Sequence, residues 1–535
     1  MPVLLLRFAA AALSGVLLYL TAPPLNWAGL AWFLWVPLLV AQVPGRHKLN
    51  FGLAYAAGWI AQTVIYSWLV DTVVIFSSLP MPIAVVVLLL FSTVFSVHFA
   101  LMFGGASWLR QRLGLLWVIA LPVLVIAVER LFPQLFPYYQ GVTQYRHPWI
   151  FQSVSVTGVW GLSFLVMLCN CVLAETVMRF REKRPPAFLA IGGAVGLFAL
   201  NLGFGAWRHG SIESDLEAAP VLDMAVLQQS VSMEERLAGT ALDGLKEWVR
   251  LTKLLDGGDA PDLVVWPEGS VFFNPNSERN ARVLGDRSPR KYFEDLAGAG
   301  GFDFLVGGGT IEQLAEPDEY GRTFTAFNST YFFRDDGGLS DRYDKMVPLP
   351  FGEYIPLSDT FPFLKGIIRG PGDFEKGQRP TTFHGTTREG TPYRFSVPIC
   401  YEAILDDTMR LLLGGDDGEE NGPVDLFVVI TNDGWFGDTA SPHQHAMLTA
   451  VYATALGRPL VRHAYTGVSW VVEPHGEISF ETDTFTQVVD VVPVRLAAYD
   501  TLYARGGWTL PWFCIVAAFG FLGLAVRRGR EEDAA

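Results

Sequence analysis

Ser396-Val397-Pro398-Ile399-Cys400-Tyr401-Glu402 is the stretch around which the rest of the chain is organised. An apolar run rich in β-forming residues ends at a cysteine, and a carboxylate follows two residues later. The other cysteines, Cys169, Cys171 and Cys514, lie in apolar segments that read as membrane-buried. Cys400 therefore has no local disulfide partner, and it is either an inert buried thiol or a nucleophile.

The composition is that of a membrane protein with a sizeable soluble part. The chain has 535 residues, of which 51% are hydrophobic and only 17% charged, and its mean hydropathy is +0.30. The net charge of −14 comes from acidic residues that crowd between positions 211 and 499. This charge argues against nucleic acid as a partner. The four cysteines form no obvious disulfide framework, and their number does not fix the compartment.

Eight apolar runs have about the ~20 residues that a spanning helix needs. They predict a polytopic α-helical membrane bundle, with seven spans in residues 1–210 and an eighth helix with a cytoplasmic tail in residues 506–535. The first run is long and lacks a clear cleavage site, which favours a retained anchor over a signal peptide. The runs are Val3–Thr21, Trp27–Val43, Phe51–Ser78, Ile83–Trp108, Leu113–Val128, Gly158–Val177, Ala187–Ala206 and Trp508–Val526.

Positive charges predict the orientation of this bundle. Basic clusters follow the second, fourth, sixth and eighth runs, so all of them fall in loops on the same side. Because basic loops stay in the cytoplasm, both termini are expected there and the polar segment 211–505 on the outer, periplasmic face. The clusters are Arg46 and Lys48; Arg110 and Arg112; Arg179, Arg181, Lys183 and Arg184; and Arg527, Arg528 and Arg530.

The polar segment alternates short β-rich runs with helical stretches. Helices are expected at Ser232–Leu255 and His443–Leu456, and Pro474-His475-Gly476 is typical of a hairpin turn. Apolar strands interleaved with helices predict an α/β layered domain. The expected strands are Val221–Leu227, Leu263–Trp266, Phe304–Val306, Asn328–Phe333, Arg394–Ile399, Leu426–Thr431, Pro459–Arg462 and Ser469–Glu473.

Two further polar residues follow strand-like runs of this domain. Glu268 comes directly after Leu263-Val264-Val265-Trp266-Pro267 and is a candidate base, although an isolated glutamate at this place is more often solvated. Lys345 precedes a proline-rich loop that carries Glu353 eight residues on. Lysine is usually a surface residue, but an ammonium beside Cys400 would lower the thiol pKa and stabilise an oxyanion.

Three short motifs together resemble the carbon-nitrogen hydrolase (nitrilase) superfamily. They are Trp266-Pro267-Glu268, Tyr343-Asp344-Lys345 and Ile399-Cys400-Tyr401-Glu402. The resemblance implies an α/β nitrilase-like αββα sandwich and acyl chemistry on a thiol. It also implies a catalytic triad of Glu268, Lys345 and Cys400, with Glu353, Tyr401 and Glu402 in supporting or substrate-binding positions.

Nearly the whole chain resembles a membrane-embedded branch of that superfamily, the apolipoprotein N-acyltransferases. The matching stretches include Val347–Pro356, Ile430–Gly437, Gly457-Arg458-Pro459 and Tyr503–Trp508. The resemblance implies the last step of lipoprotein maturation, at the bacterial inner membrane. An acyl chain would pass from a phospholipid to the α-amine of the lipidated N-terminal cysteine of an apolipoprotein, through a Cys400 thioester. No cofactor or metal is expected.

Some positions depart from the family pattern and bear on the alternatives. Leu237 stands where an aromatic is common, Tyr452 and Ala455 stand where a charged residue is usual, and Tyr465 or Thr466 replaces an asparagine. The main alternative is a membrane-anchored nitrilase-type amidase or hydrolase that releases the acyl group to water. A second is a degenerate scaffold or lipid-binding protein. The apolar segment 361–368 is either a lid over the site or an ordinary loop that covers the core.

Overall fold

The computed structural model of the chain describes residues 2–77, 79–255, 260–271, 273–279, 281, 284–317, 323–356, 360–361, 374–414 and 422–534. These residues form two compact units. One is helical and contains residues 1–70, 80–211 and 500–535; the other contains residues 71–79 and 212–499. Most of the apolar segment considered as a lid, residues 362–368, lies outside the described part of the chain.

Several helices are long and apolar enough to cross a membrane. Within the described residues, five stretches pass this test by length and composition, and a sixth does if α3 (His47–Ile65) and α4 (Leu69–Ser77) are taken as one broken span. The five stretches are α1 (Pro2–Thr21), Met81–Leu131, α11 (Val159–Arg181), α12 (Phe188–Leu216) and Gly507–Glu532, which includes most of α20 (Leu510–Ala534). The expected number of eight is therefore higher than the number of such stretches.

Two regions account for the difference. The run expected at Trp27–Val43 forms two short helices, η1 (Ala28–Trp32) and α2 (Val36–Ala41), which together are shorter than a usual span. The stretch Met81–Leu131 counts once although its 51 residues are twice the length of a span. It consists of α5 (Met81–Phe95), α6 (Val97–Phe103), α7 (Ala106–Leu113), η2 (Gly114–Leu116) and α8 (Trp117–Leu131).

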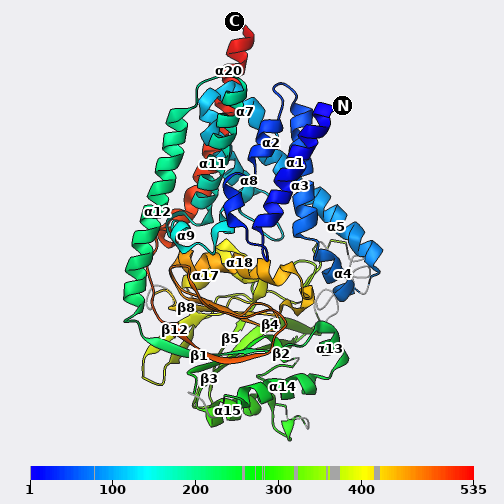
Figure 1. The fold of residues 1–535 in the computed structure, drawn as a ribbon. Coiled ribbons are helices and arrows are strands. Elements are labelled where there is room, and N and C mark those ends of the chain that lie inside the picture. The colour runs from blue at the N-terminus through cyan, green and yellow to red at the C-terminus, as the bar shows by residue number, and fades with distance from the viewer. Residues whose placement is uncertain are drawn as a thin grey trace. The chain divides into compact units, whose positions relative to one another are not determined.

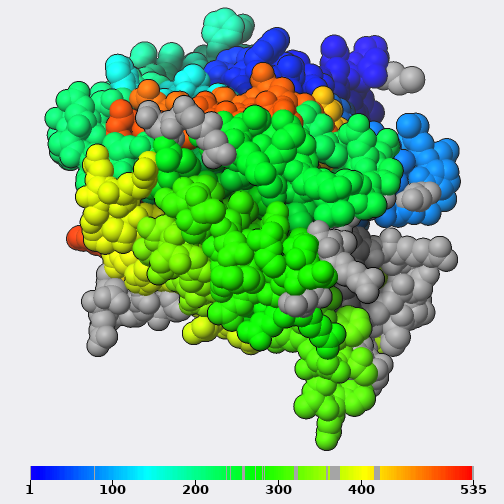
Figure 2. Space-filling model, turned by 90° about the horizontal axis from the view of Figure 1, so that it is seen from below, coloured from blue at the N-terminus to red at the C-terminus, as the bar shows by residue number. Residues whose placement is uncertain are grey.

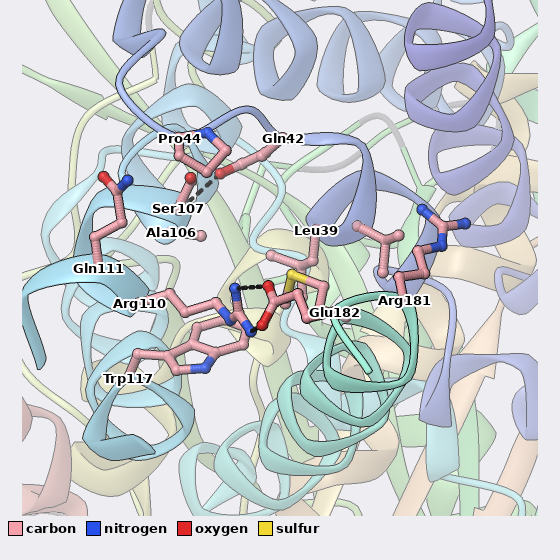
Figure 3. Close-up of a pocket in the computed structure, with 12 residues that line it drawn as sticks. Leu39, Gln42, Pro44, Ala106, Ser107, Arg110, Gln111, Trp117, Arg181 and Glu182 are labelled. Atoms are coloured by element: carbon pink, nitrogen blue, oxygen red, sulfur yellow. Dashed lines mark hydrogen bonds and ion pairs between the residues drawn. The ribbon is translucent and has the colours of Figure 1, made fainter. Parts of the chain in front are cut away.

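An ion-pair cluster around the buried carboxylate of Glu175 joins three helices of this unit. Arg110 Nε lies 2.6 Å from Glu175 Oε2, and Arg110 Nη1 lies 2.7 Å from Glu182 Oε1. The indole of Trp117 donates to Glu175, and Arg179 pairs with the same carboxylate. A pocket of about 160 Å³ opens beside this cluster (Figure 3). Arg110, one of the basic residues in the orientation argument, thus also joins α7 to α11, and Trp117 joins α8 to the same carboxylate.

The second unit is built on two six-stranded sheets, whose neighbouring strands are connected in the orders β12-β1-β2-β3-β4-β5 and β11-β10-β9-β8-β7-β6. Strands β1–β2–β3 and β7–β8–β9 run parallel, and each further strand pairs antiparallel with its neighbour. The strands are β1 (Val221–Gln228), β2 (Leu263–Val271), β3 (Asp303–Gln313), β4 (Phe324–Phe333), β5 (Leu339–Asp344), β6 (Phe383–Thr386), β7 (Pro392–Ser396), β8 (Leu426–Thr431), β9 (Leu460–Ala464), β10 (Trp470–Val472), β11 (Ile478–Glu481) and β12 (Val488–Arg495).

The two sheets pack face to face, and helices cover their outer sides (Figure 1). Strand β2 contacts β8 and β9 of the opposite sheet. Helices α14 (Ala241–Lys253) and α15 (Pro289–Gly300) lie on the first sheet, and their green surface faces the viewer in Figure 2. Helices α17 (Asp406–Gly414) and α18 (Ala440–Leu456) lie on the second. This is the αββα arrangement that the resemblance implies.

The sequence analysis located the central strands and missed several edge strands. All eight expected strands are present; β8 has the expected bounds and the other seven have shifted ends. Strands β5, β6, β11 and β12 were not expected, because they are short or polar or, in β12, contain Pro493, which an edge strand tolerates. The stretch expected to be helical at Ser232–Leu255 is helical but interrupted, because Gly239 and the capping residue Thr240 divide it into α13 (Met233–Ala238) and α14.

Aromatic side chains fill the layer between the first sheet and its helices. Trp248 of α14 stacks on Trp266 of β2 with ring centroids 5.8 Å apart. Phe293 of α15 contacts Trp266, Phe304 and Phe333 and is fully buried. Because Trp266 directly precedes Pro267-Glu268, this core holds the end of β2 in place.

Phe293→Ala should therefore lower the free energy of unfolding by about 3–5 kcal/mol, since it removes a buried aromatic ring and leaves a cavity. The matched control is Phe324→Ala in β4, where the ring is 53% exposed, and there the cost should stay below about 1 kcal/mol. Chemical denaturation of both variants in detergent measures the difference. Equal losses would contradict the assignment of Phe293 to the core.

Candidate active site

Glu268 lies on β2, just past the point where β2 leaves its regular pairing with β3. The parallel register holds as far as Trp266 and shifts before Val271. Gly269 adopts a left-handed backbone with φ of 63°, which glycine accepts readily. A Cβ at Gly307 of β3 would stand 2.5 Å from the carbonyl oxygen of Pro267. Gly269 and Gly307 thus allow the backbone of β2 to leave its pairing with β3 at Glu268.

Three groups hold the Glu268 carboxylate. The amide of Asn328 donates to Oε1 over 2.7 Å, and the backbone N–H of Asn432 donates to Oε2 over 2.8 Å. The ammonium of Lys345 lies 3.5 Å from Oε1. Both oxygens of this carboxylate are therefore held in place by donors, as the geometry of a positioned general base requires.

Lys345 follows β5, and its ammonium is buried between two carboxylates. Its side chain is 1% exposed, and Nζ lies 2.6 Å from Glu353 Oε2. Burial by itself would lower the pKa of Lys345, but Glu353, Glu268 and Cys400 raise it above its ordinary value. Lys345 is therefore a fixed cation rather than a proton donor.

Cys400 comes four residues after β7 and begins the short helix η5 (Cys400–Ile404). Its φ is 53°, a left-handed conformation that is uncommon for residues other than glycine and is often found at functional sites. The thiol is buried, and it interacts electrostatically with Glu268, Lys345 and Asp433. The structure thus brings Glu268, Lys345 and Cys400 together from three different strand ends.

The resting state of the sulfur is the thiol. Burial, followed by the charge of Glu268, raises the pKa of Cys400 well above its ordinary value, while Lys345 acts in the opposite direction. Lys345 thus lowers the thiol pKa, as expected, but burial and the nearby carboxylates outweigh this one cation. Attack by Cys400 then requires a base at the moment of reaction, and Glu268 is the carboxylate beside it.

The three supporting residues expected from the sequence also surround this point. Glu353 shares the amide of Asn328 with Glu268 and accepts from the backbone N–H of Leu349. Tyr401 is buried next to the nucleophile. Glu402 is fully buried, and its carboxylate accepts from one side chain and three backbone N–H groups. These donors are Tyr343 OH, Met346, Val347 and Ile399.

Glu402 therefore ties the loop after Lys345 to the turn that carries Cys400. Burial raises the pKa of Glu402 to about 7, against the effects of Lys345 and of its donors. Because the donors come from both segments, the distance between the ammonium and the thiol depends on this one carboxylate.

Sequence reasoning missed Asn328, which bridges the two carboxylates beside Lys345. Its backbone carbonyl also accepts from the N–H of Lys345 over 2.8 Å. The only signal was a polar residue in an otherwise apolar strand. Asp433, His445 and Arg462 were given no role from the sequence; they form a buried cluster next to Cys400.

The positions that depart from the family pattern have partners of their own. Tyr465 donates to Gln229 over 2.8 Å, and the guanidinium of Arg236 lies 4.5 Å from the centroid of its ring. Tyr452 donates to the carbonyl of Ile404 in η5. Ala455 is buried in α18. The side chain of Leu237 lies outside the described part of the chain.

Comparison with known proteins finds a matching family for each of the two halves of the chain. Residues 14–172 match the apolipoprotein N-acyltransferase N-terminal domain, and residues 225–502 match the carbon-nitrogen hydrolase family. A relative from Brucella melitensis biotype 1 is 30% identical and covers 88% of this chain and 87% of its own length. A relative from Geobacter metallireducens is 28% identical and covers 97% of this chain and 95% of its own length. A relative from Bdellovibrio bacteriovorus is also 28% identical and covers 88% of this chain and 85% of its own length. All three are named apolipoprotein N-acyltransferase.

Asn328→Asp should slow alkylation of Cys400 by iodoacetamide at a fixed pH by about 10-fold or more. A third carboxylate at this place raises the thiol pKa further, so that less thiolate is present. The rate is measured by mass spectrometry of the Cys400 peptide. Asn328→Leu is the control, because it removes the amide without adding charge, and it should have the smaller effect. Faster alkylation of the aspartate variant would contradict this electrostatic account.

Proposed function

Because the chain belongs to the apolipoprotein N-acyltransferase family of carbon-nitrogen hydrolases, we propose that it transfers an acyl chain from a phospholipid to an apolipoprotein. The acceptor is the α-amine of the lipidated N-terminal cysteine. The observation that carries this proposal is the convergence of Glu268, Lys345 and Cys400 at one buried point. Such a site provides a base, a fixed cation and a nucleophile, which together are what acyl transfer requires.

The first half of the reaction forms a thioester. Glu268 removes the thiol proton while Cys400 Sγ attacks the ester carbonyl of the phospholipid. Lys345 and a backbone N–H near Tyr401 stabilise the oxyanion of the tetrahedral intermediate. The ester C–O bond then breaks, and Glu268 returns the proton to the leaving oxygen of the lysophospholipid.

The second half transfers the acyl group to nitrogen. The neutral α-amine of the acceptor attacks the thioester carbonyl, and Glu268 takes a proton from the nitrogen. The C–S bond breaks, the proton returns to Cys400, and an amide is formed. Because an amide is more stable than a thioester, this direction needs no energy from a nucleotide.

The membrane organisation belongs to the same proposal. We infer seven spans in residues 1–210, a catalytic domain in residues 211–505 and an eighth span with a cytoplasmic tail in residues 506–535. The count of eight takes Met81–Leu131 as two spans, Ala28–Ala41 as one, and α3 with α4 as one. The basic loops put both termini in the cytoplasm and the catalytic domain in the periplasm, next to the outer leaflet of the inner membrane.

The experiment uses the full-length protein with a phospholipid that carries a labelled sn-1 chain. The label should appear on Cys400, persist there, and pass to a diacylglyceryl lipopeptide with a free amine when this acceptor is added. Cys400→Ser should abolish acylation, and Glu268→Gln should reduce thioester formation by about three orders of magnitude. Cys169→Ser is the matched control and should leave the transfer unchanged.

The other outcomes separate the alternatives. Rapid release of the label as fatty acid, without need for the lipopeptide, would identify a hydrolase. A wild-type protein that takes up no label would be neither a transferase nor a hydrolase. A Cys400→Ser protein that still transfers the acyl chain would place the nucleophile elsewhere.

A further inference from the structure

A buried charged cluster that the proposed mechanism does not use lies behind Cys400. Asp433 begins the short helix η7 (Asp433–Phe436), His445 lies on α18, and Arg462 lies on β9. The side chains of Asp433 and Arg462 are 0% exposed, and that of His445 is 10% exposed. Three separate elements of the second sheet layer thus direct polar groups to one place.

The cluster is a connected network. Arg462 Nη2 lies 2.7 Å from Asp433 Oδ2, and His445 Nδ1 lies 2.9 Å from Asp433 Oδ1. Burial by itself would raise the pKa of Asp433, but Arg462 and His445 hold it below its ordinary value, so the group is a carboxylate. A Cβ at Gly467 would stand 2.0 Å from Asp433 Oδ2, so glycine is required there.

The network ends on the backbone of the nucleophile. His445 Nε2 lies 3.3 Å from the carbonyl oxygen of Cys400. A carbonyl oxygen only accepts, so this contact requires a proton on Nε2. Arg462 Nη2 lies 3.1 Å from His445 Nδ1 and donates to it in the neutral ring, whereas in the imidazolium Nδ1 donates to Asp433. Nε2 carries a proton in both of these forms, whereas the neutral tautomer protonated only on Nδ1 would set two acceptors, Nε2 and the Cys400 carbonyl oxygen, against each other.

The carbonyl of Cys400 belongs to the same peptide group as the N–H of Tyr401. That group is planar and trans, so its C=O and N–H point in opposite directions. A donor that fixes the carbonyl therefore also fixes the direction of the N–H. The left-handed φ of 53° at Cys400 makes such a constraint necessary, since few backbone contexts keep a non-glycine residue in this conformation.

We propose that His445, oriented by Asp433 and Arg462, is a positioning residue that aims the Tyr401 N–H at the oxyanion formed on Cys400. The inference rests on the proposed function, because it assigns a role within that acyl transfer. His445 contacts neither substrate nor sulfur in this role. It acts through one peptide plane, and polarisation of the Cys400 carbonyl also makes the Tyr401 N–H a better donor.

Two reactions of Cys400 separate this role from a merely structural one. Thioester formation from a phospholipid passes through an oxyanion, whereas alkylation by iodoacetamide does not. In His445→Ala the single-turnover rate of thioester formation should fall by about 10- to 100-fold, below the full effect of removing an oxyanion donor. Alkylation of Cys400 should stay within about twofold of wild type, and the KM for phospholipid should be unchanged.

A conservative pair of variants completes the design. His445→Gln retains an N–H near the position of Nε2 and should recover thioester formation to within about fivefold of wild type, whereas the shorter His445→Asn should not. If the alanine variant does not fold, the comparison of His445→Gln with His445→Asn still tests whether an N–H at the position of Nε2 is needed. His384→Ala, at an exposed position on β6, is the control and should behave as wild type.

Three results would overturn the inference. Equal slowing of thioester formation and alkylation would indicate a general structural role, and wild-type thioester formation in His445→Ala and His445→Asn would show that the contact is not needed. In both cases the wild-type protein still forms the thioester, so the proposed function stands. A wild-type protein that alkylates but forms no thioester would instead refute the function and, with it, this role for His445.

Discussion

The buried ammonium of Lys345 is the constraint on which the rest of the catalytic unit depends. A cation with a side chain 1% exposed is expensive unless charged groups surround it. Glu353 and Glu268 supply the opposite charges at 2.6 and 3.5 Å, and Asn328 bridges these two carboxylates. Glu268 lies on β2, Asn328 lies on β4 and Lys345 follows β5, so these strands of the first sheet bring the charged groups together.

The same constraint decides how the nucleophile works. The second sheet presents Cys400 to this cation, but two nearby carboxylates and burial keep the sulfur protonated at rest. A thiol of this kind is protected until a substrate carbonyl arrives and Glu268 takes the proton. Glu402 fixes the spacing because it bonds to the backbone of both the Lys345 loop and the Cys400 turn. The site therefore separates the roles of base, cation and nucleophile among three strand ends.

The sequence predicted the parts of the structure that local patterns encode. Glu268, Lys345 and Cys400 each follow a strand-like run, and their flanking motifs were sufficient to group them. Asn328 and His445 were not assigned roles, because Asn328 contacts Glu268 across 60 positions of the chain and His445 contacts Cys400 across 45, and no local pattern reports such contacts. Polar or short edge strands were missed for a related reason: β5 and β12 are defined by their pairing partners rather than by their own apolar pattern.

A structure of the acyl-enzyme trapped on Cys400, in the absence of an amine acceptor, tests the central claim most directly. If the Lys345 ammonium is the cation that stabilises the oxyanion, the thioester carbonyl oxygen should lie within about 3 Å of Lys345 Nζ. A carbonyl oxygen that points away from Lys345, or an acyl group attached to any residue other than Cys400, would contradict the account.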